Sequence, residues 1–382
     1  MANSTQRKRI RVLFIFGTRP EAIKLAPVIK EFQKQLDYFE IKICVTAQHR
    51  EMLDQVLEVF KITPDYDLNI MEENQTLFAT SIRVLQKLQL LLKKIKPDLI
   101  FVQGDTTTAF ISALSGFYLK IPIAHVEAGL RTYDKYAPFP EEINRRLITQ
   151  LADYHFAPTK IAYKALVKEG IAPSRILITG NTVIDALLLA LKLNPHYNHP
   201  ILKKTLKTSK IILVTAHRRE SFGKPFENIC QALKTIAENH KNVEIIYPVH
   251  PNPNIRKPAY KFLNGIDRIH LIPPQDYLSF ATLMKASYII LTDSGGIQEE
   301  APALKKPVLI LREKTERPEA IAAGTAKLVG TIPEEIVKAT NLLLHSQRAY
   351  QKMAKARNPF GDGKASKRIV NYFVKLIDKR TF

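Results

Sequence analysis

Cysteine is scarce in this sequence, and long apolar runs are missing from it. The 382 residues include two cysteines, Cys44 and Cys230, which lie far apart and do not form a disulfide scaffold. No apolar run approaches the roughly 20 residues that a membrane-spanning helix needs. The basic start at residues 7–9 leads into an apolar run, 12–16, that is too short for a secretory signal. We therefore expect a cytoplasmic protein with reduced thiols and no membrane association.

Several motifs that would indicate a cofactor or a metal are also absent. The turn after the first apolar run has a single glycine, Gly17, so the GxGxxG fingerprint of dinucleotide cofactors is missing. Histidine, cysteine and acidic residues show no zinc or EF-hand spacing, and neither GxSxG nor the P-loop motif occurs. We therefore expect no cofactor and no metal.

Positive charge, in contrast, is in excess. The chain has 57 Lys and Arg against 36 Asp and Glu, a formal net charge of +21. This balance favours anionic partners such as nucleic acid, membrane surfaces or phosphorylated metabolites. The excess is spread widely, without an aromatic-interleaved basic stripe or a nucleic-acid motif. We therefore expect an anionic small molecule as the partner, and neither nucleic acid nor membrane.

Short apolar segments alternate with segments of helical periodicity along the chain. Strands are predicted at 12–16, 41–46, 99–103, 121–126, 155–157, 176–178, 211–215, 244–248, 269–272, 289–292 and 308–311. Helices are predicted at 22–36, 52–60, 77–94, 226–239 and 297–304. This alternation predicts parallel sheets covered by helices, and it occurs twice, with a break near residues 194–210. We expect two doubly wound α/β domains whose strand carboxyl ends face a ligand cleft.

The segment IILTDSGGIQEEA carries the strongest signal for a site. A predicted strand ends before Ser294, Gly295 and Gly296, and a helix follows at once. Adjacent glycines let backbone N–H groups approach a diphosphate, and a helix start adds unpaired donors. Glu299 and Glu300, one turn later, can accept hydrogen bonds from ribose hydroxyls. A plain strand–helix turn with acidic residues that suit the helix dipole is the alternative.

Acidic residues gather in the first half of the chain. Asp105 follows the predicted strand 99–103, Glu127 follows the strand that contains His125, and Glu141 opens a helix. A helix N-cap would also explain Asp105, and a cap or surface pair would explain Glu141. Three acidic groups at the ends of one predicted sheet are harder to explain in this way, and they predict acid–base chemistry.

Basic residues follow other predicted strands. Arg19 and Lys24 lie in FGTRPEAIK after the first strand, and His217 with two arginines follows the strand 211–215. A lone histidine is more often structural, and charges after a strand are often solvated. Here, the accompanying arginines indicate a positive cluster at the predicted cleft.

Three weaker signals lie in the second half. His250 follows the strand 244–248, and Arg317 lies after the strand 308–311. The loop PPQDYLSF offers Gln275 for a hydrogen bond and Phe280 for a ring contact to a base. One half of the chain thus supplies a nucleoside diphosphate seat and the other supplies carboxylates. This division predicts a nucleotide-sugar enzyme with its site between two domains.

Nine segments occur in one order: FGTRPEAIKLAP, GDTTT, HVEAGLRT, PFPEEINR, GNTVIDAL, HRRES, TDSGGIQEEAP, ERPEA and NPFGDGKAS. They resemble the non-hydrolysing UDP-N-acetylglucosamine (UDP-GlcNAc) 2-epimerases of bacteria over essentially the whole chain. The resemblance implies two Rossmann-like domains of the glycosyltransferase-B type, 1–185 and 186–363, with the C-terminal helix 364–382 packed on the first. It also implies a homodimer that needs neither cofactor nor metal.

The same resemblance implies a reaction and roles for residues. UDP-GlcNAc and UDP-N-acetylmannosamine (UDP-ManNAc) interconvert through elimination of UDP to 2-acetamidoglucal and its re-addition. The implied catalytic residues are Asp105, Glu127, Glu141 and His217. The implied substrate-binding residues are Arg19, Lys24, Gln275, Phe280, Ser294, Gly295, Gly296, Glu300 and Arg317.

Some positions concern regulation, and a few depart from the family. In some members a second UDP-GlcNAc activates the enzyme, and Gln48, Arg218 and His250 match residues that line its site. Glu51 and Asn74 replace a glutamine and an arginine there. Gln103 replaces the more usual histidine before Gly104.

Four alternatives stay open at this point. A hydrolysing 2-epimerase would release N-acetylmannosamine and UDP from the same intermediate. A 2-epimerase of a modified UDP-sugar, such as a diacetamido uronic acid, would suit a basic protein. A glycosyltransferase of the same fold would leave the carboxylates without a purpose. A nucleic-acid binder rests on charge alone, and steeply salt-dependent binding would indicate it.

Overall fold

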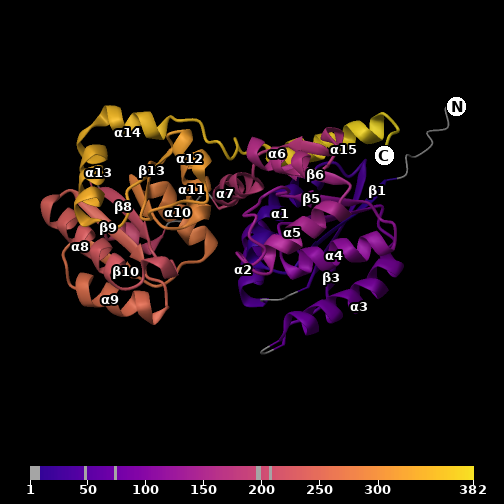
Figure 1. Ribbon diagram of the computed structural model, residues 1–382, viewed down its shortest axis with the longest axis horizontal. Helices are drawn as coiled ribbons and strands as arrows, with labels where there is room; N and C mark the ends of the chain where they lie inside the picture. The colour runs from indigo at the N-terminus through magenta and orange to yellow at the C-terminus, as the bar shows by residue number, and fades with distance from the viewer. Residues whose placement is uncertain (1–8, 47–49, 73–74, 195–198, 206–208) are drawn as a thin grey trace. The chain divides into compact units, whose positions relative to one another are not determined.

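The computed structural model describes residues 9–46, 50–72, 75–194, 199–205 and 209–382 (Figure 1). The chain divides into two compact units. Unit 1 comprises Met1–Leu189 and Gly361–Phe382, and unit 2 comprises Ala190–Phe360. The chain therefore passes between the units twice. Among the described residues, no helix has both the length and the apolar character required to cross a bilayer.

The described part of unit 1 contains a seven-stranded parallel sheet in the order β3-β2-β1-β4-β5-β6-β7. Its strands are β1 (Ile10–Phe16), β2 (Phe39–Val45), β3 (Tyr66–Asp67), β4 (Leu99–Gln103), β5 (Ile123–Val126), β6 (Tyr154–Ala157) and β7 (Ile176–Ile178). Its helices are α1 (Arg19–Phe32), α2 (Arg50–Phe60), α3 (Leu77–Ile95), α4 (Thr107–Tyr118), α5 (Glu141–Leu151), α6 (Lys160–Lys168) and α15 (Ala365–Asp378), with the 3-10 turn η1 (Pro173–Arg175). Helix α7 (Thr182–Leu193) runs across the boundary between the units.

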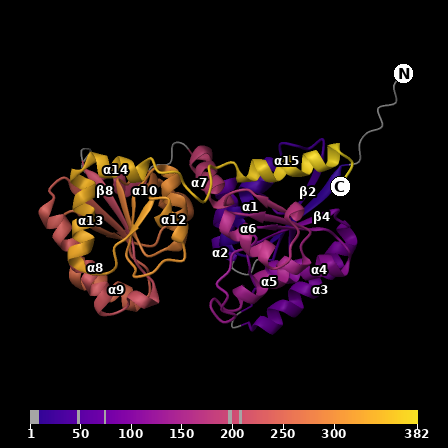
Figure 2. The ribbon, with the colours of Figure 1, turned by 45° about the horizontal axis from the view of Figure 1, so that its top comes forward.

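Helices cover both faces of the sheet of unit 1 (Figures 1 and 2). Successive side chains of a strand point to opposite faces, so the apolar run 12–16 of β1 contributes to two cores. On one face the rings of Phe14 and Phe101 stack with centroids 4.8 Å apart, and Phe373 of α15 lies 5.6 Å from Phe101. On the other face Leu13 and Ile100 join a cluster with the buried side of α3.

The described part of unit 2 contains a six-stranded parallel sheet in the order β10-β9-β8-β11-β12-β13. Its strands are β8 (Lys210–Thr215), β9 (Val243–Pro248), β10 (Ile269–Ile272), β11 (Ile289–Thr292), β12 (Val308–Ile310) and β13 (Ala326–Leu328). Its helices are α8 (Lys224–Asn239), α9 (Pro253–Leu263), α10 (Tyr277–Ala286), α11 (Gly295–Glu300), α12 (Pro318–Ala322), α13 (Pro333–His345) and α14 (Gln347–Ala354). Three 3-10 turns complete it: η2 (Pro200–Lys203), η3 (Arg219–Ser221) and η4 (Ala301–Leu304).

Both sheets reverse their strand order once, and these reversals position the candidate site. In unit 1 the order reverses between β1 and β4, and in unit 2 between β8 and β11. Loops that leave neighbouring strands in opposite directions open a crevice at their carboxyl ends, where open α/β sheets bind ligands. The turns that follow β1, β4, β8 and β11 are therefore the candidate ligand-binding segments.

The predicted fold class, two doubly wound Rossmann-like domains of the glycosyltransferase-B type, is confirmed. Each predicted strand is present, with ends that differ by at most two residues, but β3 and β13 were not predicted. The helix predicted at 297–304 is instead α11 followed by the 3-10 turn η4, which contains Pro302. Proline cannot donate the hydrogen bond that would continue an α-helix there.

Candidate active site

Glu127 lies at the centre of a buried polar cluster in unit 1. It follows β5, is 8% exposed, and has a φ of +65°, an uncommon backbone conformation for a residue with a side chain. Lys24 Nζ of α1 donates to its two carboxylate oxygens at 2.6 and 2.5 Å. Gln103 Nε2 donates at 2.6 Å and Asn181 Nδ2 at 2.9 Å. These donors, one of them cationic, favour the ionised form of the carboxylate.

The turn that carries Glu127 is pressed against α6. Gly129 has a φ of +90°, and a Cβ at this position would lie 2.3 Å from the carbonyl oxygen of Ala162. The N–H of Ala128 donates to the carbonyl oxygen of Phe156 at 3.1 Å. Only glycine fits at 129, and the close approach of α6 fixes the path of the turn.

Asp105 follows β4, at the point where the strand order reverses. Arg145 donates to its Oδ2 through Nε at 3.0 Å and also through Nη2. Burial raises the pKa of Asp105; the charge of Arg145 opposes this shift and that of Glu127 adds to it. The N-cap interpretation of Asp105 is wrong, because Thr106 caps α4 by accepting the N–H of Ala109 at 3.0 Å.

A buried glutamate, which was not predicted, joins the turns after β1 and β4. Glu21 accepts the N–H groups of Gly17 and Thr18 at 3.0 and 2.8 Å, and the hydroxyl of Thr106 at 2.6 Å. Burial raises its pKa. The carboxylate therefore fixes the start of α1, on which the predicted anion-binding residue Arg19 is the first, half-buried residue.

Glu141 is the half-buried first residue of α5. Residues four apart share one face of a helix, so Glu141 lies on the same face as Arg145, which pairs with Asp105. Its neighbour Glu142 is fully buried and accepts the N–H of Thr132 at 3.0 Å, which makes it structural. The structure thus brings Lys24, Asp105 and Glu127 together and places Glu141 on the helix that supports them.

Asp293 organises the turns at the reversal in unit 2. It is fully buried, and its Oδ2 accepts the N–H groups of His217 and Arg218 at 2.6 and 2.7 Å. His217 Nδ1 lies 3.6 Å from the other oxygen, and the ring of His250 stacks on His217 with centroids 5.3 Å apart. Burial lowers the pKa of His217; Asp293 opposes this shift, and His250 and Arg218 add to it. A neutral imidazole can both donate and accept a proton.

Gly295 lies between two guanidinium groups. A Cβ on this buried glycine would lie 3.8 Å from Arg317 Cζ and 4.0 Å from Arg218 Nη2. Ser294 precedes α11, with its N–H bonded to the hydroxyl of Thr292 at 2.9 Å. Two arginines beside a glycine turn suit a diphosphate, because guanidinium groups match its oxygens in geometry and charge.

The two glutamates of α11 differ in environment. Glu299 is buried and accepts from Nε of Arg317, so its predicted contact with ribose is corrected to an ion pair that orients Arg317. Glu300 is half-buried, with Oε1 3.7 Å from where a Cβ on Gly296 would lie. Glu300 therefore remains the candidate for a ribose hydroxyl.

The predicted base-binding residues lie near α10. The amide of Gln275 is engaged at both ends, by His199 Nε2 at 2.6 Å and by the carbonyl oxygen of Pro273 at 2.6 Å. Phe280 is half-buried in the first turn of α10. Of the residues predicted for a regulatory site, Arg218 and His250 belong to the His217 cluster, and Gln48 lies outside the described residues.

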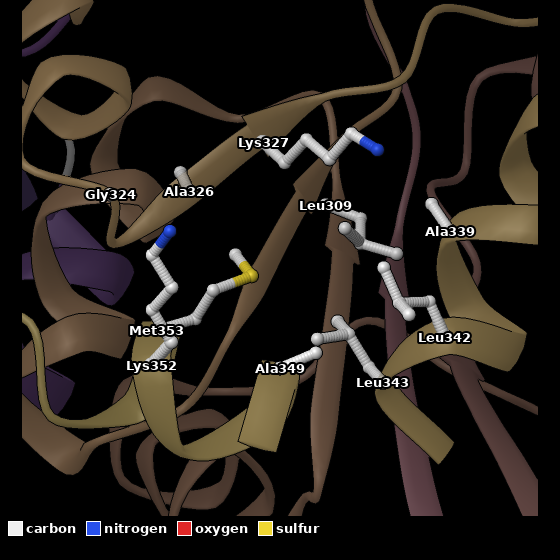
Figure 3. A pocket seen from close by; sticks show the side chains of 10 residues that line it. All are labelled: Leu309, Gly324, Ala326, Lys327, Ala339, Leu342, Leu343, Ala349, Lys352 and Met353. Carbon is white, nitrogen blue, oxygen red and sulfur yellow. The ribbon is translucent and has the colours of Figure 1, made fainter. Parts of the chain in front are cut away.

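A cavity of about 360 Å³ also occurs in unit 2, away from these clusters (Figure 3). Leu309, Leu343 and Met353 are among its apolar lining residues, and Lys327 and Lys352 stand beside it. Its described lining contains no predicted site residue.

Comparisons with known proteins agree over most of the chain. Residues 30–374 match the profile of the family described as UDP-N-acetylglucosamine 2-epimerase. The UDP-N-acetylglucosamine 2-epimerase of Escherichia coli (strain K12) is 52% identical over 370 residues, which cover 94% of this chain and 97% of that protein. The crystal structure of UDP-GlcNAc 2-epimerase from Neisseria meningitidis bound to UDP-GlcNAc has a TM-score of 0.83 at 49% identity, covering 96% of this chain and 100% of that one. The Methanocaldococcus jannaschii UDP-GlcNAc 2-epimerase in complex with UDP-GlcNAc and UDP has a TM-score of 0.75 at 37% identity, covering 96% and 100%.

Proposed function

Because the chain belongs to the UDP-N-acetylglucosamine 2-epimerase family, we propose that it interconverts UDP-GlcNAc and UDP-ManNAc by inverting C2 of the sugar. The C2 proton has no adjacent carbonyl group, so direct removal is unfavourable. When UDP leaves first, the anomeric carbon becomes oxocarbenium-like and the C2 proton becomes acidic. Loss of this proton gives 2-acetamidoglucal. Protonation at C2 on the opposite face and re-addition of UDP complete the inversion without hydrolysis.

This route needs groups that exchange a proton at C2 and groups that bind departing UDP. We assign the first task to the carboxylates of unit 1 and the second to Arg218, Arg317 and the Ser294–Gly295 turn of unit 2. The observation that carries the proposal is the contrast between Glu127 and Asp105. Three donors favour ionised Glu127, whereas burial raises the pKa of Asp105. Carboxyl groups in such contrasting environments are suited to opposite roles in proton transfer.

Substitution of the carboxylates tests this assignment. We expect Asp105→Asn, Glu127→Gln and Glu141→Gln each to lower kcat by about 10²–10⁴-fold, because each removes a proton-transferring or charge-stabilising group. The affinity for UDP, measured by calorimetry, should stay within about threefold, because unit 2 holds the nucleotide in this proposal. Glu58→Gln, an exposed change on α2, is the matched control. Near-normal turnover by all three variants would refute the site.

We further propose that the protein acts in the cytoplasm as a homodimer. Cys44 and Cys230 are free and buried, which suits a reducing compartment. On α3, Phe78, Ile82 and Leu90 are 82%, 54% and 72% exposed in the single chain and lie on one helix face. Phe117 and Tyr118 at the end of α4 add exposed rings. An apolar face of this kind on a soluble protein supports burial against a second copy.

A further inference from the structure

Asn181 connects Glu127 to the start of α7. Its side chain is buried, and both ends of its amide are used. Oδ1 accepts the N–H of Val183 at 3.1 Å, and Nδ2 donates to Glu127 Oε1 at 2.9 Å. Because an N–H group requires an acceptor, Val183 fixes which end of the amide faces the carboxylate. The position of Glu127 therefore depends on that of residues 181–183.

The second passage of the chain between the units arrives at the same place. Gly361, with a φ of +141°, is the first residue of the returning chain in unit 1, and a Cβ on it would lie 3.5 Å from the backbone nitrogen of Asn181. Asp185 of α7 accepts the N–H groups of Ala365 and Ser366 at 3.2 and 2.8 Å. The segments around 181–185 and 361–366 are thus fastened together.

The chain that returns from unit 2 to unit 1 is hydrogen-bonded to α11 just before it leaves unit 2. Asn358 Nδ2 donates to the carbonyl oxygen of Glu299 at 2.9 Å, and its Oδ1 accepts the N–H of Phe360 at 3.0 Å. The carboxylate of the same Glu299 holds Arg317 beside the glycine turn. We call residues 358–361 the crossover. Its Pro359 has a fixed φ, which leaves this short segment little freedom.

We propose that Asn181 is a positioning residue for Glu127, and that the crossover sets its position in response to the nucleotide seat at α11. This inference rests on the proposed function. Binding of a diphosphate at Arg317 and the glycine turn acts on α11, Asn358 transmits the change along the crossover, and Gly361 passes it to Asn181. Each non-covalent contact in this path lies within one unit, and the covalent chain supplies the passage between them. The result is a coupling of UDP binding to the orientation of the carboxylate.

The first test is Asn181→Asp, which keeps the acceptor for the Val183 N–H and places a carboxylate oxygen against Glu127. Among the described residues, the charged or titratable groups that act on Glu127 include Lys24, Asp105 and His125. A further negative charge opposes ionisation of Glu127. We expect kcat to fall at least tenfold at pH 7 and the acidic limb of the kcat–pH profile to move to higher pH. KM and UDP affinity should change less than about threefold, because the nucleotide seat is untouched.

Asn194→Asp is the matched control, because this residue directly follows α7 and its Nδ2 donates to the carbonyl oxygen of Ala190 at 3.0 Å. It should show the wild-type profile. A wild-type profile for Asn181→Asp would overturn the positioning role. If Asn181→Asp does not fold, as judged by circular dichroism, Asn181→Ser replaces it. The serine variant should lose kcat at unchanged UDP affinity, and unchanged kcat would overturn the role.

The second test addresses the crossover with a double-mutant cycle. We expect Asn358→Ala to lower kcat severalfold in the wild-type background and to have little effect in the Asn181→Ala background. The same fold-change in both backgrounds would overturn the coupling through Asn181. Failure of the proposed function is separate from both tests: wild-type protein that forms no UDP-ManNAc refutes the function. If the wild type forms UDP-ManNAc but the variants keep the wild-type kcat and pH profile, only this inference is refuted.

Discussion

Two histidines of unit 1 lie opposite each other on neighbouring strands and are fully buried. His125 of β5 pairs in register with His155 of β6, and its Nε2 lies 2.7 Å from the carbonyl oxygen of Gly104. Burial lowers the pKa of His125 to about 4 and that of His155 to about 3. Both rings are therefore mainly neutral in the folded protein at pH values above about 4.

This pair predicts how stability depends on pH. In the unfolded chain both histidines have a pKa near 6.5. In the folded chain the pKa is about 4 for His125 and about 3 for His155, so each ring takes up a proton only at lower pH. The unfolded state binds more protons in between, so stability is present above pH 6.5 and is lost as pH falls below it. We expect His155→Leu to reduce the slope of unfolding free energy between pH 6 and 5 by roughly 1 kcal/mol per pH unit. Urea melts at pH 7, 6 and 5 measure this slope, and identical slopes would contradict the account.

At the scale of residues, the sequence predicted the acidic and basic residues of the site but not the side chains that hydrogen-bond to them. Asp105, Glu127 and His217 each follow a predicted strand, and this position alone indicated a site. Gln103 and Asn181 were not predicted to hold Glu127, because a neutral amide at the end of an element has no distinctive pattern. The sequence places Asp293 at the end of an apolar run and assigns it no role, although its carboxylate joins two turns far apart in sequence.

At the scale of elements, two glycines near α6 have similar backbone φ angles but different surroundings. Gly129 has a φ of +90° and faces the backbone of Ala162, whereas Gly170, just after α6, has a φ of +87° and nothing within 4 Å of a Cβ. Both positions disfavour a side chain through φ. Only Gly129 adds a collision with backbone atoms.

This difference predicts unequal costs for the same substitution. Gly170→Ala should cost about 1–2 kcal/mol, the usual price of the left-handed conformation. Gly129→Ala should cost about 1–3 kcal/mol more than Gly170→Ala, because α6 must move to admit the Cβ and such overpacking typically costs this much. Thermal unfolding by circular dichroism compares them, and equal melting temperatures would refute the close approach of α6. We also expect Gly129→Ala to lower kcat, since it displaces the turn of Glu127.

Strand prediction succeeded where a strand shows as a largely apolar run in the sequence. The buried strands of five or more residues, such as β4 and β8, read as continuous apolar runs because both faces are covered. The strands β3 (YD) and β13 (AKL) are short and each contains a charged residue, so neither shows an apolar run, whereas the equally short β7 (ILI) and β12 (VLI) are entirely apolar and were predicted. The pairing of β3 and β13 at the edges of the sheets is decided by neighbouring strands.

At the scale of the whole molecule, the proposed dimer makes a prediction about mass. Ile82 of α3 and Ile161 of α6 are both 54% exposed in the single chain, but only Ile82 lies on the apolar face proposed to pair. We expect Ile82→Lys to shift the protein from dimer to monomer in sedimentation velocity, because a lysine cannot be buried there without a partner. Ile161→Lys should leave the dimer intact. A monomeric wild type, or a dimeric Ile82→Lys, would contradict the proposal.

The order of nine segments indicated the family from sequence, and the match over residues 30–374 confirms it. The contacts at the crossover could not be predicted in the same way. They join residues 181 and 361 in one place and 299 and 358 in another, and no local pattern records such long-range pairs. These contacts form only when the chain is folded.

Proton NMR of UDP-GlcNAc with the purified protein in D2O tests the central claim most directly. The account predicts UDP-ManNAc with deuterium at C2 and the bond to UDP re-formed, because the proton is lost to solvent and regained on the other face. Free N-acetylmannosamine with UDP would mean that water intercepts the intermediate. UDP-ManNAc that keeps its original C2 proton, or an unchanged spectrum, would contradict the elimination route assigned to Glu127 and Asp105.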